Sequence, residues 1–134
     1  MPRNNSVVYL DSSAIVKLVT LETETDALRS FLIPYGERVS SVLAEVEVTR
    51  ASRLYGPEAD RQAQAVLRTL STIAITRAVT AIAGRLPPSG LRSLDAIHVA
   101  TALLLGASLA VLVTYDSRMA SAAELSGISV ASPA

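Results

Sequence analysis

Four carboxylates interrupt the apolar segments of this 134-residue sequence. They are Asp11 after VVYL, Glu47 within VLAEVEV, Asp95 before AIHVATALLL, and Asp116 after VLVTY. Carboxylates that share a partly desolvated pocket repel one another, and a divalent cation removes that repulsion. Mg²⁺ prefers oxygen ligands, and a bound ion can polarise a phosphate and activate a water molecule. The four acids therefore favour metal-dependent chemistry on a phosphate ester.

The composition excludes several other kinds of site. There is no cysteine and only one histidine, His98, which removes disulfides and thiolate nucleophiles and argues against a multi-histidine zinc site. The formal net charge is zero, so the strongly basic surface of a protein that clamps long duplexes is absent. An enzyme that contacts a few phosphates remains compatible with this balance.

Each acid, taken alone, also has a structural explanation. Asp11 and Asp116 each precede a predicted helix and can cap it, although the two serines after Asp11 could cap the first helix equally well. Asp95 can stabilise the first turn of its helix through the helix dipole. Glu47 alone is typical of an exposed helix surface. Only the combination of the four favours a functional site.

The acids are positioned by strand and helix patterns that alternate along the chain. Candidate strands cover residues 7–10, 38–40, 73–75, 110–113 and 128–130. Predicted helices follow Asp11, Ser41 and Gly56, a further helix is opened by the polar stretch at 22–26, and others cover residues 77–86, 93–105 (capped by Ser93) and 117–125. Strands that are apolar on both faces and separated by helices indicate a parallel sheet covered by helices. Ligands of such folds bind beyond the carboxyl ends of the strands, where Asp11 and Asp116 fall.

The apolar run from Ala96 to Tyr115 is about long enough to span a bilayer. Gly106-Ala107-Ser108 breaks it, and aspartates bracket both ends without cationic or aromatic anchors. A buried helix, a turn and a buried strand explain the run better than a membrane span. The apolar stretch near the N-terminus is too short for a signal peptide, so we expect a cytoplasmic protein without a membrane segment.

Four blocks of this sequence resemble those of the PIN-domain family, and most closely its VapC-type toxins of bacterial toxin–antitoxin pairs. The blocks are YLDSSAIVKL at 9–18, SSVLAEVEVTRA at 40–51, LDAIHVATALLLG at 94–106 and VTYDSRMASAAELSGI at 113–128. The resemblance runs from Val7 to about Val130, and we expect residues 1–134 to form a single PIN domain with its core at 7–130. It implies a three-layer α/β/α sandwich with a central parallel sheet, and an endoribonuclease that requires Mg²⁺ or Mn²⁺.

The resemblance also implies roles for individual residues. Asp11 and Asp95 match the principal metal-binding aspartates of the family, and Asp116 matches its last acidic position, which also contacts the metal. Ser13 matches a small polar position that orients a metal-binding carboxylate, and Thr114 is expected to act in the same way.

The second block offers two acids, Glu45 and Glu47. Glu47 lies six residues after Ser41 and is followed by the basic–small pair Arg50-Ala51. This spacing selects Glu47 as the fourth catalytic residue. Glu45 is the alternative candidate for this position. Since the two are separated by two positions on a helix, they cannot face the same way.

Three further residues are weaker candidates. His98 lies one turn after Asp95 and could reach the rim of the site, although a packed or hydrogen-bonded histidine is the simpler interpretation. Arg92 and Arg118 flank the site in sequence and could hold RNA phosphates. The five aromatic residues are dispersed, so no base-stacking platform is evident.

Three other functions are alternatives to the nuclease. A phosphoacceptor receiver domain needs a lysine after a late strand, and the only lysine is Lys17. A dehalogenase-like phosphatase needs a second aspartate at the position of Ser13. A PIN-like fold without catalysis, binding RNA or protein, is the better alternative, but all four acidic positions are filled.

The resemblance implies partners as well. A VapB-like antitoxin should wrap the toxin and block its acidic pocket, giving a toxin–antitoxin hetero-oligomer. PIN toxins also commonly pair as homodimers, and the apolar excess of this sequence is compatible with a buried interface.

Overall fold

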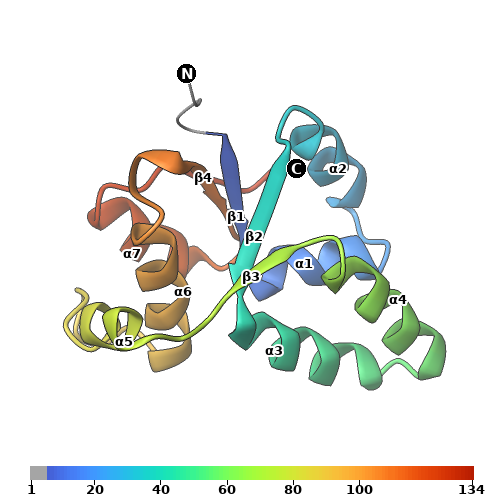
Figure 1. The fold of residues 1–134 in the computed structure, drawn as a ribbon. Helices are drawn as coiled ribbons and strands as arrows, with labels where there is room; N and C mark the ends of the chain where they lie inside the picture. The colour runs from blue at the N-terminus through green and yellow to red at the C-terminus, as the bar shows by residue number, and fades with distance from the viewer. Residues whose placement is uncertain (1–5) are drawn as a thin grey trace.

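The computed structural model describes residues 6–134, and its centre is a five-stranded parallel sheet of strand order β3-β2-β1-β4-β5 (Figure 1). The strands are β1 (Val7–Leu10), β2 (Glu37–Ser41), β3 (Ser71–Ile73), β4 (Leu109–Val113) and β5 (Val130–Ala131). All four residues of β1 are buried. A central strand of a parallel sheet is covered on both faces, which explains why VVYL reads as a continuous apolar run.

Helices form the two outer layers, with α1–α4 on one face of the sheet and α6 and α7 on the other (Figure 1). Their bounds are α1 (Ser12–Val19), α2 (Thr25–Leu32), α3 (Val42–Arg53), α4 (Pro57–Leu67), α5 (Arg77–Ala83), α6 (Ser93–Leu103) and α7 (Ser117–Leu125). In β1, Val8 and Leu10 join the core beneath α1–α4, whereas Val7 and Tyr9 join the core beneath α6 and α7, as the two-residue period of a strand requires. This arrangement confirms the predicted α/β/α sandwich.

Several predicted boundaries were wrong by a few residues. β3 covers Ser71–Ile73 instead of 73–75, because its pairing with β2 sets Val39 opposite Ser71. β5 lies at Val130–Ala131 rather than 128–130, and α5 ends at Ala83, just before Gly84. Ser93 was expected to cap α6 but is its first residue, and the helix ends at Leu103 instead of 105. All of these differences fall at the ends of elements, where helices fray and boundaries are least sharply defined.

The carboxyl ends of the strands place the functional segments at one edge of the sheet. Asp11 separates β1 from α1, Ser41 ends β2 and caps α3, and Asp116 follows β4 and caps α7. The apolar run at 96–115 folds as most of α6, a 3₁₀ turn at Gly106–Ser108 and β4, as predicted. None of the helices in residues 6–134 is long and apolar enough to span a bilayer.

Candidate active site

The four acids predicted from the sequence lie around one small cavity at this edge of the sheet. The cavity has a volume of about 150 Å³ and is lined by Asp11, Ser12, Ser13, Glu47, Asp95, His98, Asp116 and Met119. Its walls come from the N-terminal turns of α1, α6 and α7 and from the second turn of α3. Residues separated by more than 100 positions in the chain therefore share one pocket.

Asp11 is almost fully buried, and three donors hold its carboxylate. Oδ1 accepts hydrogen bonds from Ser13 Oγ at 2.7 Å and from the Ala14 backbone N–H at 2.9 Å. Oδ2 accepts from Thr114 Oγ1 at 2.6 Å. Burial raises the pKa of Asp11, while the donors from Thr114, Ser13 and Ala14 work in the opposite direction. Asp11 is thus the N-cap of α1 and a cavity residue at the same time.

Ser13, in α1, and Thr114, directly after β4, join these two segments beside the site. Thr114 Oγ1 also accepts a hydrogen bond from the Asp116 backbone N–H at 3.0 Å, and Ser13 Oγ accepts one from Tyr115 N–H at 2.9 Å. The same two hydroxyls that orient Asp11 therefore fix the segment that leads into α7. Such outer contacts determine how precisely a site carboxylate is placed.

Glu47, and not Glu45, faces the cavity. Glu47 Oε1 accepts hydrogen bonds from Ser12 Oγ at 2.5 Å and from His98 Nε2 at 2.8 Å. Burial alone would raise the pKa of Glu47, but the contacts with His98 and Ser12 outweigh it and hold this pKa below its ordinary range. Glu45 is exposed and accepts a hydrogen bond from Thr72 Oγ1 at 3.0 Å.

His98 is buried behind Glu47 instead of lying at the rim of the site. Its Nδ1 is 2.7 Å from the Tyr9 hydroxyl, and the two rings meet edge to face with centroids 5.8 Å apart. Because an ionised carboxylate can only accept, His98 Nε2 donates to Glu47, and in a neutral ring Nδ1 then accepts from Tyr9. Burial raises the pKa of the Tyr9 hydroxyl, which keeps it protonated for this contact.

Sequence reasoning missed Ser12 and Tyr9 and underestimated His98. The three-residue spacing from Asp95 to His98 predicts that both lie on one helix face. Nothing in the sequence pairs His98 with Glu47 or Tyr9, which are 51 and 89 positions away. Those contacts exist only because α3, α6 and β1 meet in the folded chain.

Asp95 and Asp116 are held much less firmly. Within residues 6–134 no donor contacts the Asp95 carboxylate, and its pKa is raised by burial and by repulsion from Asp116 and Asp11, against the attraction of Arg92 and His98. Asp116 Oδ1 accepts hydrogen bonds from two backbone N–H groups at the start of α7, at 2.9 and 3.2 Å. Its carboxylate is therefore a helix cap whose other oxygen is free of protein donors in this part of the chain.

The donor set of the cavity fits a hard divalent cation. Its acidic ligands are all oxygens, and the repulsion acting on Asp95 is the kind that a cation relieves. In the side-chain orientations of the described residues, no three acidic or histidine groups converge closely enough to coordinate one ion. Coordination of one ion by three of these groups would therefore require a change in side-chain orientation.

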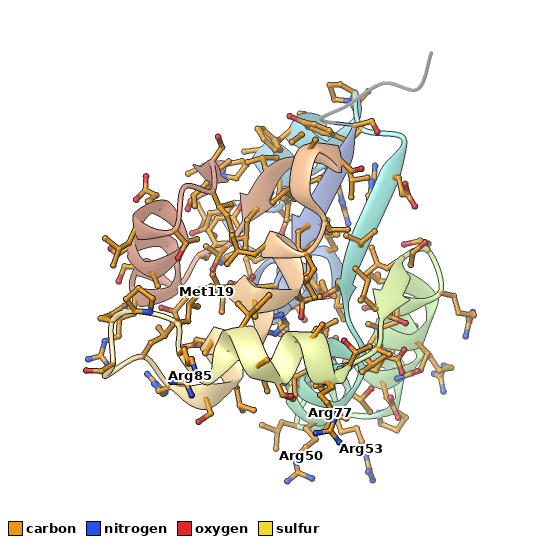
Figure 2. The ribbon with its side chains drawn as sticks, turned by 60° about the vertical axis from the view of Figure 1, so that its left-hand side comes forward. Arg50, Arg53, Arg77, Arg85 and Met119 are labelled. Carbon is orange, nitrogen blue, oxygen red and sulfur yellow. The ribbon has the colours of Figure 1, made fainter. Side chains whose placement is uncertain are left out.

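Five exposed arginines lie on α3, α5 and α7 and at the N-terminal end of α6. Arg50 and Arg53 project from α3 and Arg77 from the start of α5, and they lie at the same lower end of the molecule in Figure 2. Arg92 and Arg118 line a second, larger pocket beside the cavity. In the described chain the ion pairs of lysine and arginine involve only Lys17 and Arg61, so these five arginines have no acidic partner within 4 Å.

Comparisons with known proteins agree with this architecture. The family model described as "PIN domain" matches residues 8–125. Ribonuclease VapC46 of Mycobacterium tuberculosis (strain ATCC 25618 / H37Rv) is 47% identical over 128 residues, covering 96% of this chain and 98% of the relative. Ribonuclease VapC35 of the same strain is 42% identical over 131 residues, covering 95% and 97%.

Solved structures share the fold at low sequence identity. A chain of the toxin–antitoxin complex from Klebsiella pneumoniae superposes with a TM-score of 0.74 at 22% identity, covering 95% of this chain and 98% of that one. A chain of FitAcB from Neisseria gonorrhoeae superposes with a TM-score of 0.68 at 19% identity, covering 94% and 97%.

Proposed function

Because this chain belongs to the PIN-domain family and, within it, groups with the VapC ribonucleases, we propose that it is a VapC-type endoribonuclease that hydrolyses RNA phosphodiester bonds with Mg²⁺, or alternatively Mn²⁺. The observation that carries the proposal is the meeting of Asp11, Glu47, Asp95 and Asp116 around one cavity. The proposed substrate is cellular RNA, and from this substrate we infer a cytoplasmic location.

The cavity residues would have different roles in such a reaction. Asp11, Asp95 and Asp116 would hold the cation, which when bound polarises the scissile phosphate and activates the attacking water. Ser13 and Thr114 keep the Asp11 carboxylate in one orientation. Glu47, whose carboxylate accepts hydrogen bonds from His98 and Ser12, would accept a proton from the attacking water.

A VapB-like antitoxin is the proposed protein partner. The solved relatives include toxin–antitoxin complexes, among them VapBC2 from Rickettsia felis. On this chain Val46, Leu54 and Tyr55 of α3 and the turn that follows it are exposed by 57%, 85% and 74%. Exposed large apolar side chains of this kind support a protein interface, either with the antitoxin or in a homodimer.

The direct test is cleavage of total RNA by the purified protein with Mn²⁺ or Mg²⁺, compared with Asp11→Asn. We expect the wild type to produce defined fragments and the variant to lose more than about 100-fold in rate, beyond the 10–100-fold usual for a supporting residue. Asp26→Asn, which changes an exposed acid on α2, should cut normally. RNA binding without cleavage by either wild type or variant would instead indicate a catalytically silent module.

A further inference from the structure

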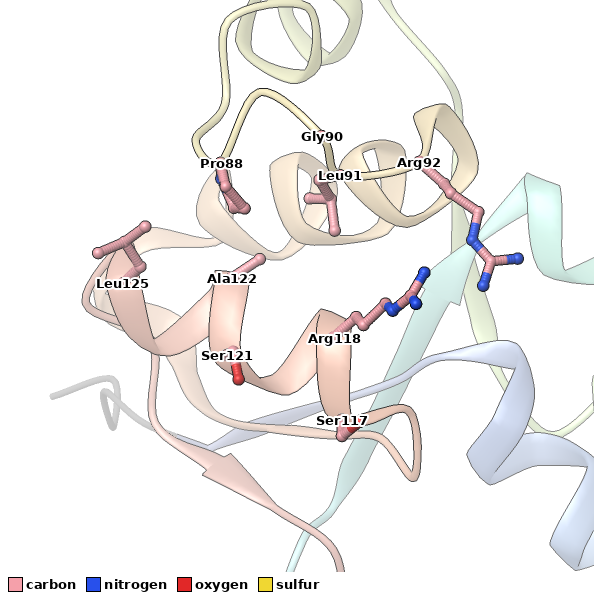
Figure 3. A pocket seen from close by; sticks show the side chains of 9 residues that line it. All are labelled: Pro88, Gly90, Leu91, Arg92, Ser117, Arg118, Ser121, Ala122 and Leu125. Atoms are coloured by element: carbon pink, nitrogen blue, oxygen red, sulfur yellow. The ribbon is translucent and has the colours of Figure 1, made fainter.

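A second pocket opens beside the acidic cavity, between the loop before α6 and the exposed side of α7. Its volume is about 590 Å³, within the roughly 300–1,000 Å³ of small-molecule sites. Figure 3 shows its two kinds of lining: Pro88, Leu91 and Leu125 lie toward one end, and the guanidinium groups of Arg92 and Arg118 lie at the other. The pocket therefore combines an apolar wall with a cationic mouth.

The charge of this pocket is opposite to that of the cavity next to it. Its nine lining residues include two arginines and no acid, whereas four of the eight residues around the cavity are acidic. Neither Arg92 nor Arg118 forms an ion pair within residues 6–134. Unpaired guanidinium groups bind phosphates in a bidentate manner and also stack on nucleobases. The complementary ligand is an anion that carries a flat apolar group.

The two sites are lined by neighbouring residues at the starts of α6 and α7, although no residue lines both. Arg92 is the N-cap of α6, three residues before Asp95, and it acts electrostatically on that carboxylate. Arg118 lies two residues after Asp116, and its neighbour Met119 lines the acidic cavity. A nucleotide joined to a phosphate in the acidic cavity would therefore reach the pocket along the first turns of α6 and α7.

We propose that this pocket receives one unpaired base of the RNA beside the bond that is cut, while Arg92 and Arg118 contact the adjoining phosphate. This inference rests on the proposed ribonuclease function and deepens it, because it makes the pocket a determinant of the cleavage site. Unpaired bases that leave the stack are the features by which proteins read RNA sequence. The acidic cavity repels phosphate, so cationic groups beside it also help to bring the strand in.

The first test measures binding of a fluorescent single-stranded oligoribonucleotide in Ca²⁺ by anisotropy. Arg92→Ala and Arg118→Ala should each weaken binding about tenfold and lower the salt slope by about 0.7, the value for one phosphate contact on a single strand. Arg29→Ala removes the same charge from an exposed position of α2 and should leave both quantities unchanged. Equal binding by all three variants would overturn the proposal.

The second test fills the pocket and reads the cleavage sites. A side chain at Gly90 meets no atom within 4 Å and needs no left-handed backbone, so Gly90→Phe should fold normally while it obstructs the pocket. We expect at least a tenfold change in base preference at one position beside the cut. Gly36→Phe is the matched control, because Gly36 is equally unobstructed but precedes β2 at the opposite end of the sheet.

The outcomes separate the two proposals. Cleavage with unaltered base preference in Gly90→Phe overturns the pocket assignment and leaves the ribonuclease function intact. Binding that depends on Arg92 and Arg118, without any cleavage by the wild type, supports the pocket and overturns the ribonuclease function. Loss of a bound protein partner by the pocket variants, with normal RNA binding, assigns the pocket to that partner and overturns the RNA proposal.

Discussion

The four acids of the cavity form two pairs that differ in how the protein holds them. Asp11 and Glu47 each accept hydrogen bonds from two side chains, and behind Glu47 lies a buried histidine. Asp95 and Asp116, by contrast, receive no side-chain donor within residues 6–134, and only Asp116 accepts backbone N–H groups. We call the first pair the held pair and the second the open pair.

The two pairs differ in how they affect the stability of the folded protein. In the held pair, donors offset the cost of burying charge, so these carboxylates are oriented before any ligand arrives. In the open pair the attraction of Arg92 and His98 does not offset the burial of Asp95 and its repulsion by Asp116 and Asp11. Functional sites of this kind often lower the stability of the whole protein. Substitutions in the held pair's support should therefore destabilise the protein, whereas neutralising Asp95 of the open pair should stabilise it.

The largest expected loss of stability follows from His98→Ala. It removes a buried ring that contacts Tyr9 and Glu47, and we expect about 3 kcal/mol of destabilisation from the cavity and the unpaired Tyr9 hydroxyl. Cleavage should also fall 10–100-fold, because Glu47 loses its support. Urea unfolding and a cleavage assay measure the two effects. Leu28→Ala in buried α2 should destabilise similarly with normal cleavage; a parallel loss of cleavage would show that the effect is only structural.

Thr114→Val should have the next largest effect. The change keeps the shape of the side chain but removes the hydroxyl that donates to Asp11 and accepts from Asp116 N–H. We expect a loss of about 1–3 kcal/mol, because two buried polar groups lose a partner, and a 10–100-fold slower cleavage. Thr69→Val, at an exposed hydroxyl, is the control. Unchanged cleavage would mean that Asp11 does not depend on Thr114 for its orientation.

Asp95→Asn should have the opposite sign in protein treated with EDTA. Removing one of the repelling charges should raise the unfolding free energy by about 0.5 kcal/mol, the scale of a partly exposed substitution, while cleavage is lost. Mn²⁺ should raise the melting temperature of the wild type more than that of the variant, since a ligand that binds the native state stabilises it. Equal shifts by Mn²⁺ would contradict the assignment of Asp95 to a metal site.

The smallest expected effect concerns Glu47 and acid pH. Its pKa in the folded protein lies below the ordinary value of 4.5, so the unfolded chain binds the proton first as the pH falls. The ionised carboxylate therefore stabilises the protein above pH 4.5, and this contribution disappears as the pH falls through the folded pKa. The advantage of wild type over Glu47→Gln, under about 1 kcal/mol at pH 7, should vanish in acid. Glu124→Gln, at an exposed position of α7, is the control for the change of charge.

The fold class, the family and the identity of the four acids could be inferred from the sequence. Those inferences depend on local information: continuous apolar strands such as Val7–Leu10 require a covered parallel sheet, and acids within apolar segments stand out from solvated ones. The acidic positions at the strand ends then fall at the edge where α/β folds place their sites. The limits of the short edge strands were missed because pairing across the sheet decides them.

The way in which each acid is supported became evident only from the folded chain. Glu47 and Glu45 are nearly equivalent in the sequence, and the packing of α3 turns one toward Ser12 and His98 and the other toward Thr72. Hydrogen bonds between residues 51 to 103 positions apart leave no periodic trace in a sequence, because they depend on three-dimensional packing. The held pair and the open pair could therefore be told apart only in the folded protein.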